Sequence, residues 1–173
     1  MPAPRRPLDD LLLYRLSRLV GVAGGMVIRL CEGRFGITRR EWRLIAVLAS
    51  RGELGSSQLA EQAQLDRART SKAVGSLVQK QLVSRVARSG DRRQVLLGLT
   101  EAGQALYDEL FPLVTGINAE LMGALGKEDA ARLDESLHRL QERAERMVQQ
   151  AVLPKADRGR RGPAPAAKPG RAA

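Results

Sequence analysis

The chain contains 173 residues with a net charge of +10, and only 3% of the residues are aromatic. This length accommodates one compact domain of about 150 residues and a polar tail, and an aliphatic core favours packed helices over a β-sandwich. One cysteine and one histidine exclude an internal disulfide and a Cys/His metal cage, and no apolar stretch is long enough to span a membrane, so we expect a mostly α, cytoplasmic protein without metal or cofactor.

Two helices are expected in the first part of the chain. Apolar side chains recur every three or four positions over residues 9–34, which predicts a long amphipathic helix. Thr38 and Glu41 have the spacing of a capping box, in which each side chain accepts a backbone amide of the other. A second helix is therefore predicted over residues 39–50.

The next two helices are short and closely spaced. Ser56 and Ser57 offer N-caps for a helix over residues 58–63, and Asp66 caps another that runs over residues 67–81. Two helices joined by two or three residues are typical of a helix-turn-helix motif.

A charged hairpin is expected to follow. Residues 83–87 and 94–99 have the character of strands, and the loop over residues 88–93 carries three arginines and a glycine. A small hairpin directly after a helix-turn-helix is a wing, so the sequence predicts a mostly α winged helix-turn-helix with a two-stranded wing.

The last helices point to a partner chain. Thr100 caps a fifth helix that continues to Leu125 with an expected bend at Pro112. The sixth helix has a heptad-like apolar seam, and such a seam requires a partner. Its residues are Leu133, Leu137, Leu140, Ala144, Met147 and Ala151. Residues 154–173 are rich in Pro, Ala, Gly, Arg and Lys without apolar periodicity, which predicts a disordered basic tail.

The charge distribution and the helix-turn-helix together indicate DNA binding. Residues 1–100 and the tail are basic, whereas residues 101–153 are acidic, as expected for a protein with one phosphate-facing side. The N-terminal turns of a recognition helix enter the major groove, and arginines on a wing suit a narrow minor groove. The candidate DNA-binding residues are Ser57, Gln58, Arg67, Arg69, Thr70, Ser71, Lys72, Arg88, Arg92 and Arg93. Asp91 is expected to orient a neighbouring arginine.

Several of these segments resemble the multiple-antibiotic-resistance regulator (MarR) family. The resemblance lies in residues 38–45, 82–85, 91–93 and 99–103, covers roughly residues 8–150, and departs at Gln81, where the family often has glycine. It implies an obligate homodimer on a pseudo-palindromic operator in duplex DNA, with Arg93 in the minor groove beside Asp91. The implied parts are an N-terminal dimerisation helix (1–37), a DNA-binding lobe (38–100), C-terminal dimerisation helices (101–153) and the tail (154–173).

The resemblance also implies a small-molecule effector, an aromatic carboxylate or phenolic compound, that releases a repressor from its operator. A buried carboxylate requires a cationic partner, so arginines near aromatic side chains in the first two helices are candidates. The candidate ligand-binding residues are Tyr14, Arg15, Arg18, Trp42 and Arg43. Alternatively, the two aromatic residues belong to the core, and the arginines to the surface or to DNA contacts.

Two other functions remain open. Some relatives sense oxidants through a thiol, but Cys31 lies near the end of the first helix rather than its start, which favours a buried, inert cysteine. A second alternative is an architectural protein that coats DNA without sequence preference through its basic tail. No nucleophile–base pair, phosphate loop or paired carboxylates occur at useful spacing, so an enzyme is not expected.

Overall fold

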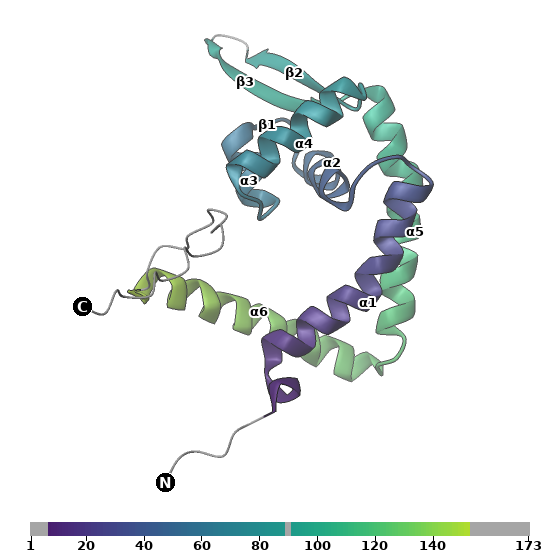
Figure 1. The fold of residues 1–173 in the computed structure, drawn as a ribbon, viewed down its shortest axis with the longest axis vertical. Coiled ribbons are helices and arrows are strands. Elements are labelled where there is room, and N and C mark those ends of the chain that lie inside the picture. The colour runs from purple at the N-terminus through teal and green to yellow at the C-terminus, as the bar shows by residue number, and fades with distance from the viewer. Residues whose placement is uncertain (1–6, 89–90, 153–173) are drawn as a thin grey trace, which may run out of the picture. The chain divides into compact units, whose positions relative to one another are not determined.

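The computed structural model describes residues 7–88 and 91–152, with the backbone alone at residues 87, 88 and 91–94 (Figure 1). The predicted tail over residues 154–173 lies outside the described residues. The chain divides into two units, Met1–Leu125 and Gly126–Ala173, which are described separately. The elements are η1 (Leu8–Asp10), α1 (Leu12–Gly33), α2 (Arg39–Arg51), β1 (Leu54–Gly55), α3 (Ser56–Gln62), α4 (Arg67–Gln79), β2 (Val83–Arg88), β3 (Asp91–Leu99), α5 (Glu101–Met122) and α6 (Lys127–Gln150).

The first unit is a winged helix-turn-helix that is preceded in the sequence by the long helix α1 and followed by the long helix α5. Figure 1 shows α1 lying alongside α5, and Arg34 at the end of α1 forms an ion pair of 2.7 Å with Glu109 of α5. The predicted capping box starts α2, since Thr38 Oγ1 accepts the Glu41 amide at 3.2 Å and Glu41 accepts the Thr38 amide at 2.6 Å. The mostly α winged-helix fold predicted from the sequence is confirmed.

The start of α3 differs from the prediction. Its N-cap is Gly55, whose amide donates to Gln58 Oε1 at 3.1 Å, and Ser56 and Ser57 lie in the first turn. The reason is β1, a two-residue strand that pairs with β3 and leads directly into the helix. A strand of this length has no visible alternation, so the sequence pattern could not indicate it.

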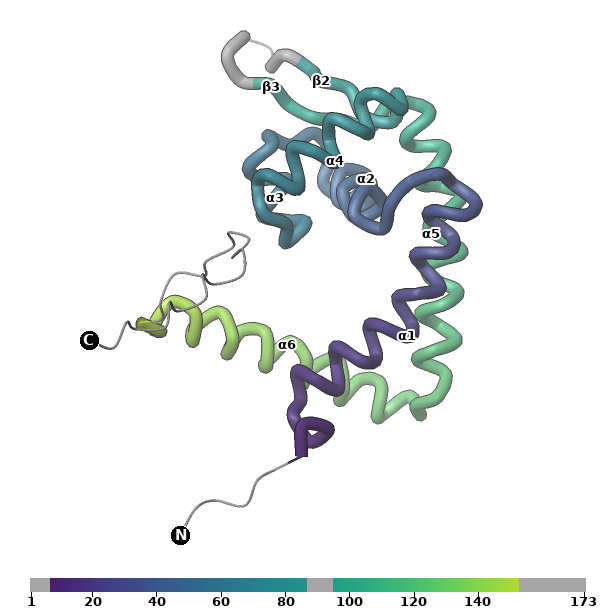
Figure 2. Tube along the Cα trace, in the orientation of Figure 1, coloured from purple at the N-terminus to yellow at the C-terminus, as the bar shows by residue number. Residues whose placement is uncertain are grey.

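The wing is confirmed as an antiparallel hairpin of β2 and β3, which run beside each other in Figure 2. With β1 they form a three-stranded sheet in the order β1-β3-β2. The register pairs Val83 with Leu99 and Arg85 with Leu97, so the buried side chains of Val83 and Leu97 lie next to the helices. Both strands extend further toward the hairpin tip than predicted.

A single core holds the lobe together. Side chains from the end of α1, from α2, α3, α4 and the sheet, and from the first half of α5 contribute to it. The principal buried residues are Ile37, Trp42, Leu44, Ile45, Leu48, Leu59, Val74, Leu77, Val83, Leu97 and Leu110. Strand β3 of the wing and helix α4, the second helix of the helix-turn-helix and its predicted recognition helix, therefore pack on the same core.

The recognition helix, the wing and α5 meet at a close backbone contact. The Thr100 hydroxyl accepts the Gly103 amide at 3.0 Å and donates to the Gln81 carbonyl at 2.6 Å, while the Thr100 amide donates to Leu82 O at 3.2 Å. A methyl group on Gly103 would overlap the Leu82 carbonyl oxygen. Gln81 has a φ of 59°, which ends α4 at Gln79 instead of Gln81 and explains why glycine suits this position.

The second unit contains α6, which the structure describes throughout and in which no residue is buried. The leucines and Met147 of the predicted heptad-like seam are between 38% and 54% exposed. α5 continues through Pro112 and ends at Met122, three residues earlier than predicted. Within the described residues, we find no helix with the length and apolarity needed to cross a membrane.

Candidate nucleic-acid interface

The N-terminal half of α4 presents a cationic, exposed face. Arg67, Arg69, Ser71 and Lys72 are all exposed, while Ala73, Val74 and Leu77 on the opposite face are buried. Asp66 caps the helix by accepting the Arg69 amide at 2.8 Å, and its other oxygen lies 3.1 Å from Arg69 Nε. The guanidinium of Arg69 is thereby directed by its own helix cap.

Thr70 cannot contact DNA bases in this structure, which corrects the prediction. Its side chain is 0% exposed, and its hydroxyl donates to the Asp66 carbonyl oxygen at 3.0 Å. The helical positions of Thr70, Ala73, Val74 and Leu77 place all four on the core face. A hydroxyl that bonds to the backbone one turn earlier is satisfied within the helix, so its polarity does not imply an external partner.

Helix α3, which precedes α4, carries two exposed polar residues, Ser57 and Gln58, and both were predicted to contact DNA. Gln58 has a structural role as well, because its Oε1 accepts the amide of Gly55. Its amide nitrogen, the other end of the same group, donates hydrogen bonds and suits phosphate or base acceptors.

The wing backbone follows the predicted hairpin, but the side chains of Arg88, Asp91, Arg92 and Arg93 lie outside the described residues. Arg85 on β2 is exposed and adds a cation to the described part of the wing. It was not among the predicted contacts, and because Arg85 shares a face of the sheet with the buried Val83, the period-two pattern alone does not indicate its exposure.

The five candidate ligand residues have different environments. Trp42 is buried, whereas Arg18 pairs with Asp9 at 3.1 Å and Arg43 donates to the Ala63 carbonyl at 3.2 Å. Tyr14 is half-buried and Arg15 is exposed on α1. Arg18 and Arg43 thus have protein partners, as expected if they serve the structure.

Two aromatic residues that were not predicted extend from Trp42 toward the surface. Tyr107 stacks on Trp42 with ring centroids 5.7 Å apart, and Phe111 stacks on Tyr107 at 5.0 Å. Phe111 is 43% exposed, so the stack runs from the core to the solvent. The spacing of Tyr107 and Phe111, four residues apart on one helix, is the signal that could have indicated a shared face.

Cys31 is fully buried at the end of α1. Burial, and to a lesser degree the negative charge of Glu32, raise the pKa of its thiol. The thiolate is the form that reacts with oxidants and alkylating reagents, and burial also restricts access to it. These observations favour the inert cysteine over the redox sensor.

We expect the native protein to react with a thiol-specific chromogenic disulfide far more slowly than the urea-unfolded protein. Mild peroxide should leave duplex binding unchanged, and Cys31→Ser should respond as the parent protein does. Loss of binding on oxidation, prevented by Cys31→Ser, would reinstate the redox sensor.

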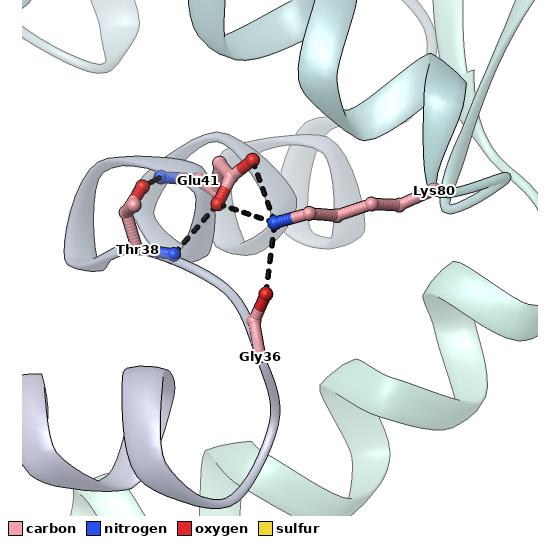
Figure 3. A network of polar contacts seen from close by, with 4 residues as sticks. All are labelled: Gly36, Thr38, Glu41 and Lys80. Carbon is pink, nitrogen blue, oxygen red and sulfur yellow. Dashed lines mark hydrogen bonds and ion pairs between the residues drawn. The ribbon is translucent and has the colours of Figure 1, made fainter.

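A buried carboxylate joins α2 to α4. Glu41 accepts the Thr38 amide, and both of its oxygens accept from Lys80 Nζ at 3.0 and 3.1 Å (Figure 3). Burial raises the pKa of Glu41, but hydrogen bonds from Ser76, Thr38 and Lys80 and the positive charge of Lys80 outweigh burial and lower the pKa overall. The carboxylate therefore stays ionised in the folded protein.

The lowered pKa of Glu41 predicts a stability that depends on pH. Because the folded-state pKa lies below the unfolded one, this contribution is complete above the ordinary glutamate pKa of about 4.3 and is lost as the pH falls through the folded-state pKa. Urea unfolding between about pH 6 and pH 3 should show a smaller difference between the parent protein and Glu41→Gln at the acid end. A constant difference across this range would contradict the assignment.

A helix-turn-helix with an exposed cationic second helix, followed by a hairpin on the same core, defines a winged-helix DNA-binding protein. The MarR family model matches residues 35–94. The regulator FarR of Neisseria gonorrhoeae is 35% identical over 104 residues, which are 60% of this chain and 71% of FarR. The chain belongs to the MarR family and is a transcriptional regulator.

Solved structures agree with this membership. A MarR family regulator from Silicibacter pomeroyi aligns with a TM-score of 0.71 and 25% identity, over 82% of this chain and 96% of that one. NadR, whose crystal structure contains 4-hydroxyphenylacetate, aligns with a TM-score of 0.66 and 28% identity, over 80% of this chain and 97% of NadR.

Proposed function

We propose that the protein is a homodimeric, sequence-specific repressor that leaves its operator when a small aromatic anion or phenol binds. The observation that carries the DNA-binding part of this proposal is the exposed, cationic N-terminal half of α4. This helix and the wing pack on the same core. A helix of this kind enters the major groove, where Arg69 and Ser71 face the bases and Arg67 and Lys72 contact phosphates, while the wing, with Arg88, Arg92 and Arg93, reaches the adjacent minor groove.

Exposed apolar side chains support the dimer. On α1, Leu12, Leu13, Leu19 and Val20 are between 45% and 81% exposed, and the seam of α6 is exposed too. Soluble monomers rarely expose large contiguous apolar surfaces, and helices that carry them pair with one another. Residues 1–37 and 101–153 would then form the dimerisation region, and a two-fold symmetric protein matches a pseudo-palindromic operator.

The aromatic stack supports the effector. Trp42, Tyr107 and Phe111 lead from the core to the surface between α2 and α5, and aromatic ligands stack on such rings. The solved complex of NadR with 4-hydroxyphenylacetate shows that a relative binds an aromatic carboxylate. Tyr14 and Arg15 on α1 remain candidates to contact the phenol and the carboxylate.

Selection from random duplexes tests the DNA-binding proposal. A sequence-specific dimer should enrich a palindrome of roughly 10 to 20 base pairs. Enrichment of no sequence would overturn the proposal and favour the architectural protein. Arg93→Ala should weaken binding to every duplex and flatten its salt dependence, whereas Arg69→Ala should relax the sequence preference.

The effector is tested on the selected operator. 4-Hydroxyphenylacetate and related aromatic acids should lower operator affinity in a concentration-dependent way, and Phe111→Ala should weaken this response without altering affinity in the absence of the acid. The exposed Leu121 of the same helix provides a matched control as Leu121→Ala. Release by none of a panel of aromatic acids and phenols would contradict the ligand class.

A further inference from the structure

One ammonium group ties the end of α4 to the connection between α1 and α2. Lys80, the residue that follows α4, donates to the Gly36 carbonyl at 2.8 Å and to the two Glu41 oxygens at 3.0 and 3.1 Å (Figure 3). The three acceptor atoms match the three N–H groups of the ammonium. Gly36 lies between α1 and α2, and Glu41 lies in the first turn of α2. A single side chain therefore connects three parts of the lobe.

The carboxylate makes this connection rigid. Glu41 has a side chain that is only 3% exposed, and it accepts from Thr38 as well as from Lys80. Ser76, four residues before Lys80, also contributes to the lowered pKa of Glu41. Charge-assisted hydrogen bonds in a buried site are stronger than neutral ones, so the contact between Lys80 and Glu41 is a strong link between the end of α4 and the start of α2.

The other contacts of α4 are of two kinds. Ala73, Val74 and Leu77 hold the helix by apolar packing, which is non-directional, and hydrogen bonds with Thr100 hold the backbone just after the helix, at Gln81 and Leu82. The cationic residues lie at the opposite end of a helix that is about 20 Å long, so a small rotation near Lys80 displaces Arg67 by a larger distance.

We propose that Glu41 and Lys80 are a positioning pair that fixes the direction of α4 relative to α1 and thereby the place of the DNA-reading end of α4. The first half of this statement concerns the folded chain alone. The second half rests on the proposed function, in which α4 binds DNA.

The positioning is tested by a distance measured within one chain. Spin labels at Ser17→Cys on α1 and Ala68→Cys on α4 occupy exposed positions, and the buried native Cys31 is shielded from labelling. Labelled protein diluted in excess unlabelled protein isolates the distance within a chain. Lys80→Met should broaden or shift the distance distribution, whereas Lys127→Met, which removes the same charge from the exposed start of α6, should not.

A double variant distinguishes a loss of positioning from a loss of folding. Lys80→Met leaves the buried Glu41 charge without its partner, whereas Glu41→Gln/Lys80→Met removes both charges and retains an acceptor for the Thr38 amide. Helix content and melting are measured by circular dichroism, and distances are compared below the melting transition. An unchanged distribution in the folded double variant would overturn the positioning role.

The consequence for the DNA-reading end of α4 is tested on operators whose half-sites are moved apart by one and two base pairs. The parent protein should prefer one spacing, and the double variant should lose affinity at that spacing by about tenfold while changing little at the others. An equal loss at every spacing would overturn this consequence of the pair. If the parent protein showed no spacing preference, the proposed function would fail, and the distance measurement would still decide the positioning role.

Discussion

Replacing Gly103 with alanine should destabilise the first unit by about 3 kcal/mol. The added methyl group overlaps the Leu82 carbonyl oxygen, and this atom belongs to the backbone that accepts the Thr100 amide, so it cannot move without disturbing the start of α5. Because Leu82 also precedes β2, the strain reaches the wing. Urea unfolding followed by circular dichroism measures the loss.

The same helix offers a matched control. Gly116 lies in α5 with no atom within 4 Å of the position that a Cβ would occupy. Gly116→Ala should therefore leave the protein as stable or stabilise it by about 0.5–1 kcal/mol through helix propensity. If Gly103→Ala and Gly116→Ala had the same effect, the close contact between α5 and Leu82 would be refuted.

Removing two cations from α4 should change DNA binding much more than it changes stability. Arg67 and Lys72 are exposed, and neither is part of the core. In the Arg67→Ala/Lys72→Ala variant, the slope of log K against log salt should fall in magnitude by about 3.6, which is 0.9 for each of four phosphate contacts in a dimer. Operator affinity at moderate salt should fall by more than about tenfold.

The control for this variant removes the same charge elsewhere. Lys127 and Arg132 are exposed on α6, so Lys127→Ala/Arg132→Ala lowers the net charge equally without altering α4. Titrations at several salt concentrations compare both variants with the parent protein. Equal slopes for the two variants would show that overall charge, and not the face of α4, determines binding.

Local patterns predicted most of the elements correctly. The period of apolar residues gave α1 and α6, the Thr38/Glu41 spacing gave the start of α2, and the Asp66 and Thr100 caps gave the starts of α4 and α5. Each of these signals depends on residues within about one or two helical turns of each other. Such short-range constraints act before any distant part of the chain is in place.

The role of individual polar residues was harder to predict. Threonine is a residue type that contacts DNA in many helix-turn-helix proteins, yet the direction of the Thr70 side chain follows from which face of α4 packs on the core. Glu41 was predicted as a cap and is also the partner of Lys80, which lies 39 residues further along the chain. Tyr107 and Trp42 are likewise brought together only by the packing of α5 on α2.

The sequence by itself determined the order of the helices α1 to α6, the caps of α2, α4 and α5, the wing hairpin and the basic character of the DNA-facing half. Tertiary structure alone decided that Thr70 faces inward, that Gly103 must lack a side chain, and that Lys80 joins α4 to the α1–α2 connection. The physical reason is range: hydrogen bonds and apolar periodicity within a helix are encoded by neighbours in the chain, whereas burial and close backbone approach depend on segments that meet only after folding.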